Sequence, residues 1–170
     1  TELSVTNQYG LRDSIIVNVV AIPGLAVAAE PASATLAQIN GGIALFPDGN
    51  FFSTASFAAG EAVEIIFQIM PDSAHVGAVA DIILALVVSG AEIPVSFMNS
   101  EGVLQDYDGT QMPAMLTMAL PQQVLIDVTG GIPLALSAEQ AGSYALYIGY
   151  FLKATGELFY SSEAVVLEVN

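Results

Sequence analysis

The sequence contains no cysteine, no tryptophan, one histidine and only two basic residues, Arg12 and Lys153. Without cysteine there is neither a disulfide framework nor thiol chemistry. Against 17 Asp and Glu residues, two cations cannot form the basic face that nucleic-acid binding needs. An anionic membrane surface would repel the chain for the same reason. We therefore exclude nucleic acid as a partner.

Apolar residues, in contrast, are abundant. Hydrophobic residues make up 54% of the chain and charged residues 11%, where about 25% is usual in soluble domains. The most apolar window, residues 76–90, contains Asp81 and is shorter than the roughly 20 residues of a spanning helix. We expect no membrane insertion. The surplus apolar surface then indicates burial against another protein.

The hydrophobic pattern has a period of two, and turn signals recur about every ten residues. Val63, Ile65, Phe67 and Ile69 alternate with more polar neighbours, as in a half-buried strand. Pro47-Asp48-Gly49-Asn50 predicts a turn, with a return strand over residues 50–57. Residues 24–42 are alanine-rich and fit either a short helix or two weak strands. The predicted fold class is all-β: an antiparallel β-sandwich of the Ig-like or jelly-roll type, with an N-terminal strand arm.

The closing part of the chain carries a family resemblance. Residues 142–152 read GSYALYIGYFL, an apolar and aromatic stretch with aromatic residues at 144, 147, 150 and 151, and Thr155-Gly156 and a valine-rich segment follow. This stretch resembles the last hairpin of secreted prokaryotic Ig-like modules, which occur in surface proteins and extracellular filaments. The resemblance implies that Tyr144 is a corner tyrosine whose hydroxyl bonds the main chain upstream.

The N-terminal arm, residues 1–22, is predicted to precede a sandwich domain of residues 23–170. Two alternating segments, residues 1–9 and 13–22, predict two strands. They belong either to an edge of their own sandwich or to the sheet of a neighbouring copy, since strands added across chains satisfy main-chain groups and insert alternate side chains. The residues expected at such an assembly contact are apolar or aromatic: Leu3, Val5, Tyr9, Ile15, Val17 and Val19.

Catalytic candidates are few. A serine–histidine–acid triad would need His75, the only histidine, but Ser73 is its near neighbour in the same loop and no Gly-x-Ser-x-Gly motif is present. We expect His75 to pack or hydrogen-bond within its turn. Asp106 and Asp108 could form a glycosidase pair, but there is no tryptophan for a sugar platform. We predict that the protein is not an enzyme.

Asp106 and Asp108 are the candidate metal ligands, because Asp-x-Asp-Gly places two carboxylates on one turn and Ca²⁺ prefers oxygen ligands. A solvated turn without metal is the competing interpretation. No cofactor is expected to be required.

These features predict a secreted structural protein at or beyond the cell surface. Its partners would be other copies of itself, assembled into a filament or sheath by strand donation. The chain begins at Thr1 with no recognisable signal peptide, as a processed secreted protein would. The alternative is a monomeric Ig-like adhesion or binding module of a larger surface protein, with a ligand face on loops such as residues 106–110.

Overall fold

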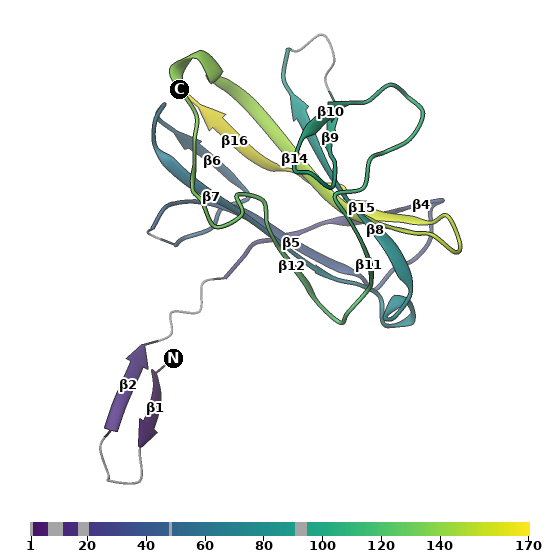
Figure 1. Ribbon diagram of the computed structural model, residues 1–170, viewed down its shortest axis with the longest axis horizontal. Coiled ribbons are helices and arrows are strands. Elements are labelled where there is room, and N and C mark those ends of the chain that lie inside the picture. Colours follow the sequence, from purple (N-terminus) through teal and green to yellow (C-terminus); the bar gives the residue numbers. More distant parts are fainter. Residues whose placement is uncertain (1, 7–11, 17–20, 48, 91–94) are drawn as a thin grey trace.

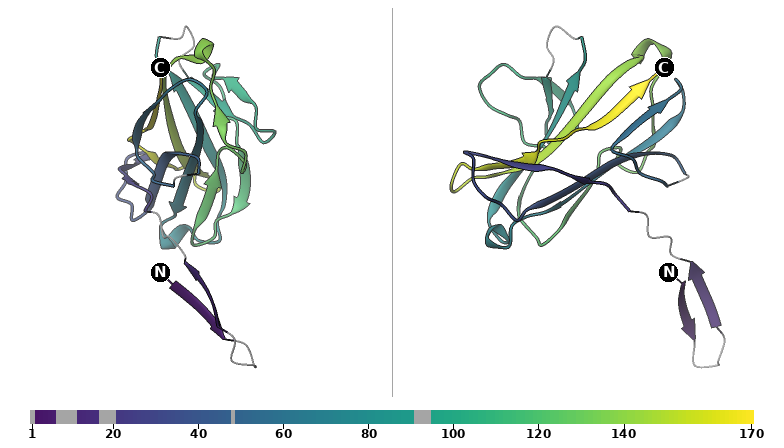
Figure 2. Two further views of the ribbon diagram at one scale, coloured as in Figure 1. Left: turned by 90° about the vertical axis from the view of Figure 1, so that its left-hand side faces the viewer. Right: turned by 180° about the vertical axis from the view of Figure 1, so that it is seen from behind.

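The computed structural model describes residues 2–6, 12–16, 21–47, 49–90 and 95–170, and side chains only from residue 21 onward. It confirms an all-β fold of two facing, mainly antiparallel sheets, seen in two orientations in Figure 2. The strands are β1 (Glu2–Thr6), β2 (Arg12–Ile16), β3 (Gly24–Leu25), β4 (Val27–Glu30), β5 (Gln38–Leu45), β6 (Thr54–Phe57), β7 (Ala62–Met70), β8 (Val79–Val88), β9 (Val95–Met98), β10 (Leu104–Asp106), β11 (Leu116–Ala119), β12 (Val124–Asp127), β13 (Leu134–Ala135), β14 (Gly142–Leu152), β15 (Leu158–Ser161) and β16 (Val165–Val169). Two short 3₁₀ turns are η1 (Ser73–His75) and η2 (Ala138–Gln140). Among the described residues, no helical segment has the length and hydropathy needed to span a membrane.

The large sheet is built around β8 and β14, which pair antiparallel from Tyr144↔Val88 to Leu152↔Ala80. Each of these strands has two partners on its other side, one for each half of its length. β14 pairs with β16 and then β15, and β8 pairs with β11 and then β9. Strands β10, β4 and β6 extend the sheet beyond these (Figure 1). The aromatic stretch at residues 142–152 is therefore the central strand of the larger layer.

On the side away from β8, a short interval of β14 between its β16 and β15 partners has no strand beside it. There the main-chain N–H of Ile148 donates to the hydroxyl oxygen of Ser161, at 3.1 Å. Ser161 is the fully buried polar residue among those described. Since an unpaired buried amide is costly, this serine maintains hydrogen bonding where the strand changes neighbours.

The small sheet has the order β12-β7-β5-β3, and β13 pairs with the start of β7. The alternation predicted in β7 is confirmed: Val63, Ile65, Phe67 and Ile69 are all buried. They face the large sheet and pack against residues of β8 and β14, including Ile82, Leu84, Ile148 and Tyr150. Burying each such side chain contributes about 1.5–3 kcal/mol, so the space between the sheets is the main source of stability.

The segment that the sequence left undecided, residues 24–42, contains β3, β4 and the start of β5, with an irregular stretch over residues 31–37 and no helix. β3 pairs with β5 in the small sheet, and β4 pairs with β15 in the large one, so the chain changes layers at Ala26. The Ala26 N–H donates to the Glu163 carboxylate, and its carbonyl accepts from the N–H of Ser162. Both main-chain groups are thus satisfied at the point of crossing, where no ladder is available.

The return strand predicted at residues 50–57 does not pair along β5 as expected. Only one bridge, Ile43↔Phe52, pairs this segment with β5. The chain then leaves the small sheet, and β6 pairs in parallel with β16 in the large sheet. The predicted turn lies between β5 and β6 in the sequence. The pairing of β6 with β16, however, depends on residues more than 100 positions away, and local turn signals do not report such long-range pairing.

The N-terminal strands β1 and β2 form a two-stranded antiparallel sheet of their own, which we call the arm hairpin. In Figures 1 and 2 it lies outside the two layers of the sandwich. The second strand is shorter than predicted, because residues 21 and 22 are not in a strand. Tyr9, Val17 and Val19 lie outside the described residues.

Candidate functional site

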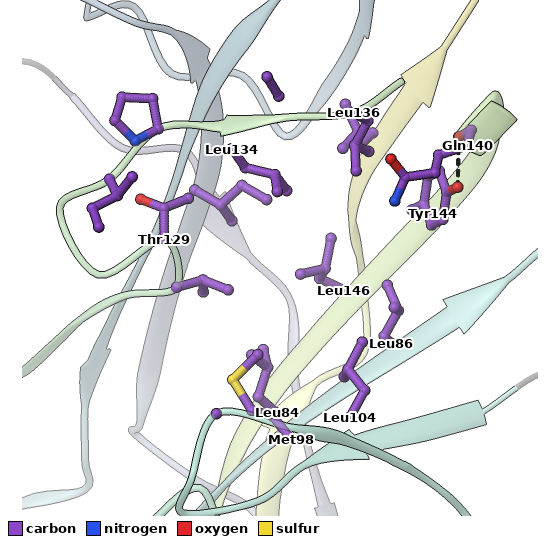
Figure 3. A pocket seen from close by; sticks show the side chains of 17 residues that line it. Leu84, Leu86, Met98, Leu104, Thr129, Leu134, Leu136, Gln140, Tyr144 and Leu146 are labelled. Carbon is purple, nitrogen blue, oxygen red and sulfur yellow. Dashed lines mark hydrogen bonds between the residues drawn. The ribbon is translucent and has the colours of Figure 1, made fainter. Parts of the chain in front are cut away.

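An apolar cleft of about 600 Å³ opens between the two sheets (Figure 3). Its walls come from both layers: Leu84, Leu86 and Leu146 from the centre of the large sheet, and Leu134 and Leu136 from the segment around β13. Met98 and Leu104, on β9 and β10, form the outer part of the large-sheet wall. A volume in the range of about 300–1,000 Å³ is typical of ligand-binding pockets.

The cleft exists because the sheets end unevenly. On this side the large sheet continues past β8 with β9 and β10, while β13 is the last described strand of the small sheet. At the other end of the same side, the chain passes directly from β11 in the large sheet to β12 in the small one. Buried Leu120 lies in that connection, and its N–H bonds the carbonyl of Ala78. The β11–β12 connection therefore closes the gap between the sheets at one end, and the gap stays open at the end near β13.

Among the described residues that line the cleft there is no Asp, Glu, Lys, Arg or His. Its few polar groups already have partners. The Tyr144 hydroxyl donates to the carbonyl oxygen of Gln140 at 2.6 Å (Figure 3), and Gln140 Oε1 accepts from the N–H of Ser137. The Thr129 hydroxyl donates to Asp127. What the cleft offers an occupant is therefore mainly apolar surface.

The Tyr144 hydrogen bond runs to the main chain four residues upstream, as expected of a corner tyrosine. It ties the 3₁₀ turn η2 to the start of β14. The ring of Tyr144 also forms part of the cleft wall, so the same residue shapes the corner and the cleft.

The side chain of His75 does pack, but against Tyr150 and Phe159 at the end of the core and not within its own turn. Its Nδ1 lies 2.9 Å from the hydroxyl of Tyr150, and its ring lies 4.7 Å from that of Phe159, centre to centre. The Tyr150 oxygen also accepts from the N–H of Asp72 at 3.5 Å, which leaves its proton free to be donated to the imidazole. Main-chain N–H groups of Ala74 and Leu36 bond the Asp72 carboxylate and lower its pKa. The histidine thus caps the buried tyrosine at the end of the core.

Asp106 and Asp108, the predicted metal ligands, each have a local hydrogen-bond partner. Asp106 accepts from the hydroxyl of Ser96 at 2.9 Å. Asp108 accepts from both the hydroxyl and the N–H of Thr110, and these bonds lower its pKa. Across the described ranges, no three Asp, Glu or His side chains converge as metal ligands. Ca²⁺ binding at this turn stays a prediction.

Asp81, the one carboxylate in an apolar strand, lies near the start of β8 and pairs with Lys153 at 2.9 Å. Its side chain is 15% exposed and that of Lys153 is 51% exposed. Burial raises the pKa of Asp81, but hydrogen bonds from Thr117 and Lys153 outweigh it and lower the pKa overall. One of the chain's two basic residues therefore neutralises a mostly buried carboxylate near the sheet end.

Replacing Lys153 by methionine should lower the free energy of unfolding by about 1 kcal/mol at pH 7, the scale of a half-exposed ion pair. The lowered pKa means that the ion pair stabilises the fold when Asp81 is ionised. The effect should therefore diminish as the pH falls below about 3.9, the usual pKa of aspartate. Urea unfolding of the wild type, Lys153→Met, Asp81→Asn and the double variant measures the coupling. Equal coupling at pH 7 and pH 2.5 would contradict the assignment.

The predicted assembly residues within the described strands fall on one face of the arm hairpin. Leu3 is opposite Ile15 and Val5 is opposite Asp13, and residues two apart on a strand share a face. By register, Leu3, Val5 and Ile15 thus share one face with Asp13.

Sequence patterns did not locate the cleft. The excess of apolar residues indicated surface for a partner, but the cleft depends on one sheet being wider than the other, which alternation within single strands does not report. Comparison with known proteins adds no function: no protein-family model matches the chain, and no curated protein matches it.

Proposed function

We propose that the chain is an extracellular structural subunit that assembles with copies of itself into a filament or sheath through its N-terminal arm. The observation that supports this most directly is that β1 and β2 pair with each other and with none of the described strands of the sandwich. An isolated two-stranded hairpin is marginally stable in water. The hairpin becomes more stable if the face that holds Leu3, Val5 and Ile15 is buried, and a second copy of the chain can bury it.

The charge distribution also supports self-assembly through the arm. Residues 1–22 contain Glu2, Asp13 and Arg12, for a net charge of −1, while residues 23–170 contain the other 15 acidic residues and Lys153, for −14. Two sandwich bodies repel each other at neutral pH. The nearly neutral arm is the part of the chain that another copy repels least.

Deleting residues 1–9 should abolish assembly, because it removes β1 and therefore the hairpin. Light scattering and electron micrographs of the purified full chain should show filaments, and the shortened chain should remain monomeric. A finer comparison places the same charge on opposite faces of β1: Val5→Asp should prevent assembly and Ser4→Asp should have little effect. Filaments that persist unchanged after the deletion would rule out the arm as the assembly element.

The second candidate function is a monomeric binding module, which the apolar cleft favours. Its size suits a neutral, apolar ligand. This function predicts a monodisperse monomer at all concentrations of the full chain, with uptake of a neutral dye such as Nile red. Light scattering on the full chain distinguishes the two functions.

A further inference from the structure

We propose that the apolar cleft is the docking site for the arm hairpin of a second copy, which enters as a two-stranded unit. The inference depends on the proposed assembly function and names the surface that receives the arm. It differs from donation of a single extended strand, because β1 and β2 are already paired with each other over five residues each.

The first argument is the difference in strand number between the two layers at the cleft. Here the large sheet extends two strands beyond β8, namely β9 and β10, and among the described strands nothing in the small sheet lies beyond β13. Facing sheets bury their apolar faces about 10 Å apart. A two-stranded hairpin placed beside β13 would supply the two strands that the small sheet lacks opposite β9 and β10.

The second argument is the match between surfaces. By register, Leu3, Val5 and Ile15 lie on one face of the hairpin, and Asp13, opposite Val5, lies on the same face near the loop end. The cleft presents Met98, Leu104 and Leu134 near its mouth, together with Ile132, which is 77% exposed. Since none of the described residues that line the cleft is charged, the apolar positions of the hairpin enter it and Asp13 stays at the mouth, in water. The exposed edge of β13 could also hydrogen-bond an added strand.

The third argument is reach, which excludes a chain's own arm. Pro23 is held beside β5 by the Gly41 N–H, at the edge of the small sheet opposite β13. A position beyond β13 is four strand spacings away, about 19 Å. It is also displaced about 13 Å along the strands, from the level of Phe67, the partner of Gly41, to that of Val63.

The resulting straight-line distance is about 23 Å, and the seven chain steps from Ile16 to Pro23 span only about 23–25 Å at full extension. The straight line runs through the small sheet, so any real path is longer. The hairpin that fills the cleft must therefore come from another molecule. Because the arm leaves one edge of the sheet and the cleft lies at the other, the contact is head-to-tail and can propagate.

Single cysteines test the contact directly, because the chain has none of its own. Full-length Val5→Cys and Ile132→Cys proteins are mixed under mild oxidation, so that a mixed disulfide can form only between two copies. The matched control is Leu125→Cys, also exposed at 61% but on the outer face of β12. We expect at least about tenfold more mixed disulfide with Ile132→Cys than with Leu125→Cys, in the range of effective concentrations that docking produces.

A second pair of variants tests the same contact without cysteine. Leu104 lines the cleft and Leu116 lies on β11 away from it, and both are 45% exposed. Leu104→Glu should raise the concentration at which assembly begins by at least about tenfold, because docking would bury an unpaired charge. Leu116→Glu should leave that concentration within about twofold.

The outcomes separate the inference from the proposed function. Filaments that form equally well with Leu104→Glu, and that show no preference for Ile132→Cys, would overturn the cleft as acceptor while leaving assembly intact. A full chain that stays monomeric and binds Nile red in the cleft would overturn both. A specific disulfide confined to closed dimers would support the cleft contact and contradict the filament.

Discussion

Replacing Gly149 by alanine should abolish the folded state or destabilise it by more than about 3 kcal/mol, beyond the usual cost of overpacking. Gly149 lies in β14, the central strand of the large sheet, opposite Tyr160 of β15. A Cβ there would lie 2.4 Å from the carbonyl oxygen of Phe159 and 2.8 Å from the Cβ of Tyr160. Because the closest contact is with backbone, a change of side-chain rotamer cannot relieve it.

Relief would require β15 to move away from β14, which would break the ladder from Gly149↔Tyr160 to Phe151↔Leu158. The control is Gly24→Ala, at another strand position, where an added Cβ would meet only the Asn40 side chain at 3.5 Å. It should change the free energy of unfolding by less than about 1 kcal/mol. Circular dichroism and urea unfolding measure both variants. A Gly149→Ala protein as stable as Gly24→Ala would show that β15 can shift at little cost.

The same strand illustrates how far the sequence could predict this fold. The apolar and aromatic stretch at residues 142–152 predicted a strand, and the structure places that strand at the centre of the large sheet. Burial on one face also appeared correctly in β7. In β7 a local period of two is enough, because it reports which side chains face the core. The pattern does not report which strand lies alongside, so the need for glycine at 149 becomes clear only from the approach of Phe159 and Tyr160.

Long-range pairing explains the other differences. Residues 50–57 were expected beside β5 but pair mainly with β16. The ion pair between Asp81 and Lys153 joins residues 72 positions apart. The contact between His75 and Tyr150 likewise joins residues 75 positions apart. The apolar cleft is the most extreme case, because it results from the relative widths of two complete sheets.

The sequence therefore indicated that apolar surface was left for a partner, and the structure identifies where that surface is. Central β14 connects the two observations. Its Tyr144 and Leu146 form part of the cleft wall, and its Ile148 and Tyr150 lie in the closed core. The effects of Gly149→Ala and Leu104→Glu should thus be separable. Gly149→Ala should impair folding, and Leu104→Glu should impair only association.

Alkaline conditions should destabilise the wild type through Tyr150 by up to about 2–3 kcal/mol between pH 10 and pH 12. Tyr150 is fully buried, and this burial raises its pKa from 10.0 to about 12. In the unfolded chain the phenol ionises near pH 10, so above that value the unfolded state loses a proton that the folded state retains. The stabilising contribution is complete below pH 10 and is lost as the pH rises through about 12.

Tyr150→Phe isolates this effect, because phenylalanine preserves the stacking on Phe159, at 5.0 Å between ring centres, and removes the titrating group. At pH 8 the variant should be less stable by about 1–2 kcal/mol, because the His75 and Asp72 hydrogen bonds to the hydroxyl are lost. Between pH 10 and pH 12 its stability should fall less steeply than that of the wild type, so the two curves converge. Tyr107→Phe is the control, since Tyr107 is exposed at 39% and its removal should leave the slope unchanged. Parallel curves for the wild type and Tyr150→Phe would mean that the Tyr150 phenol ionises equally easily in the folded and unfolded chain, and hence that water reaches the His75 end of the core.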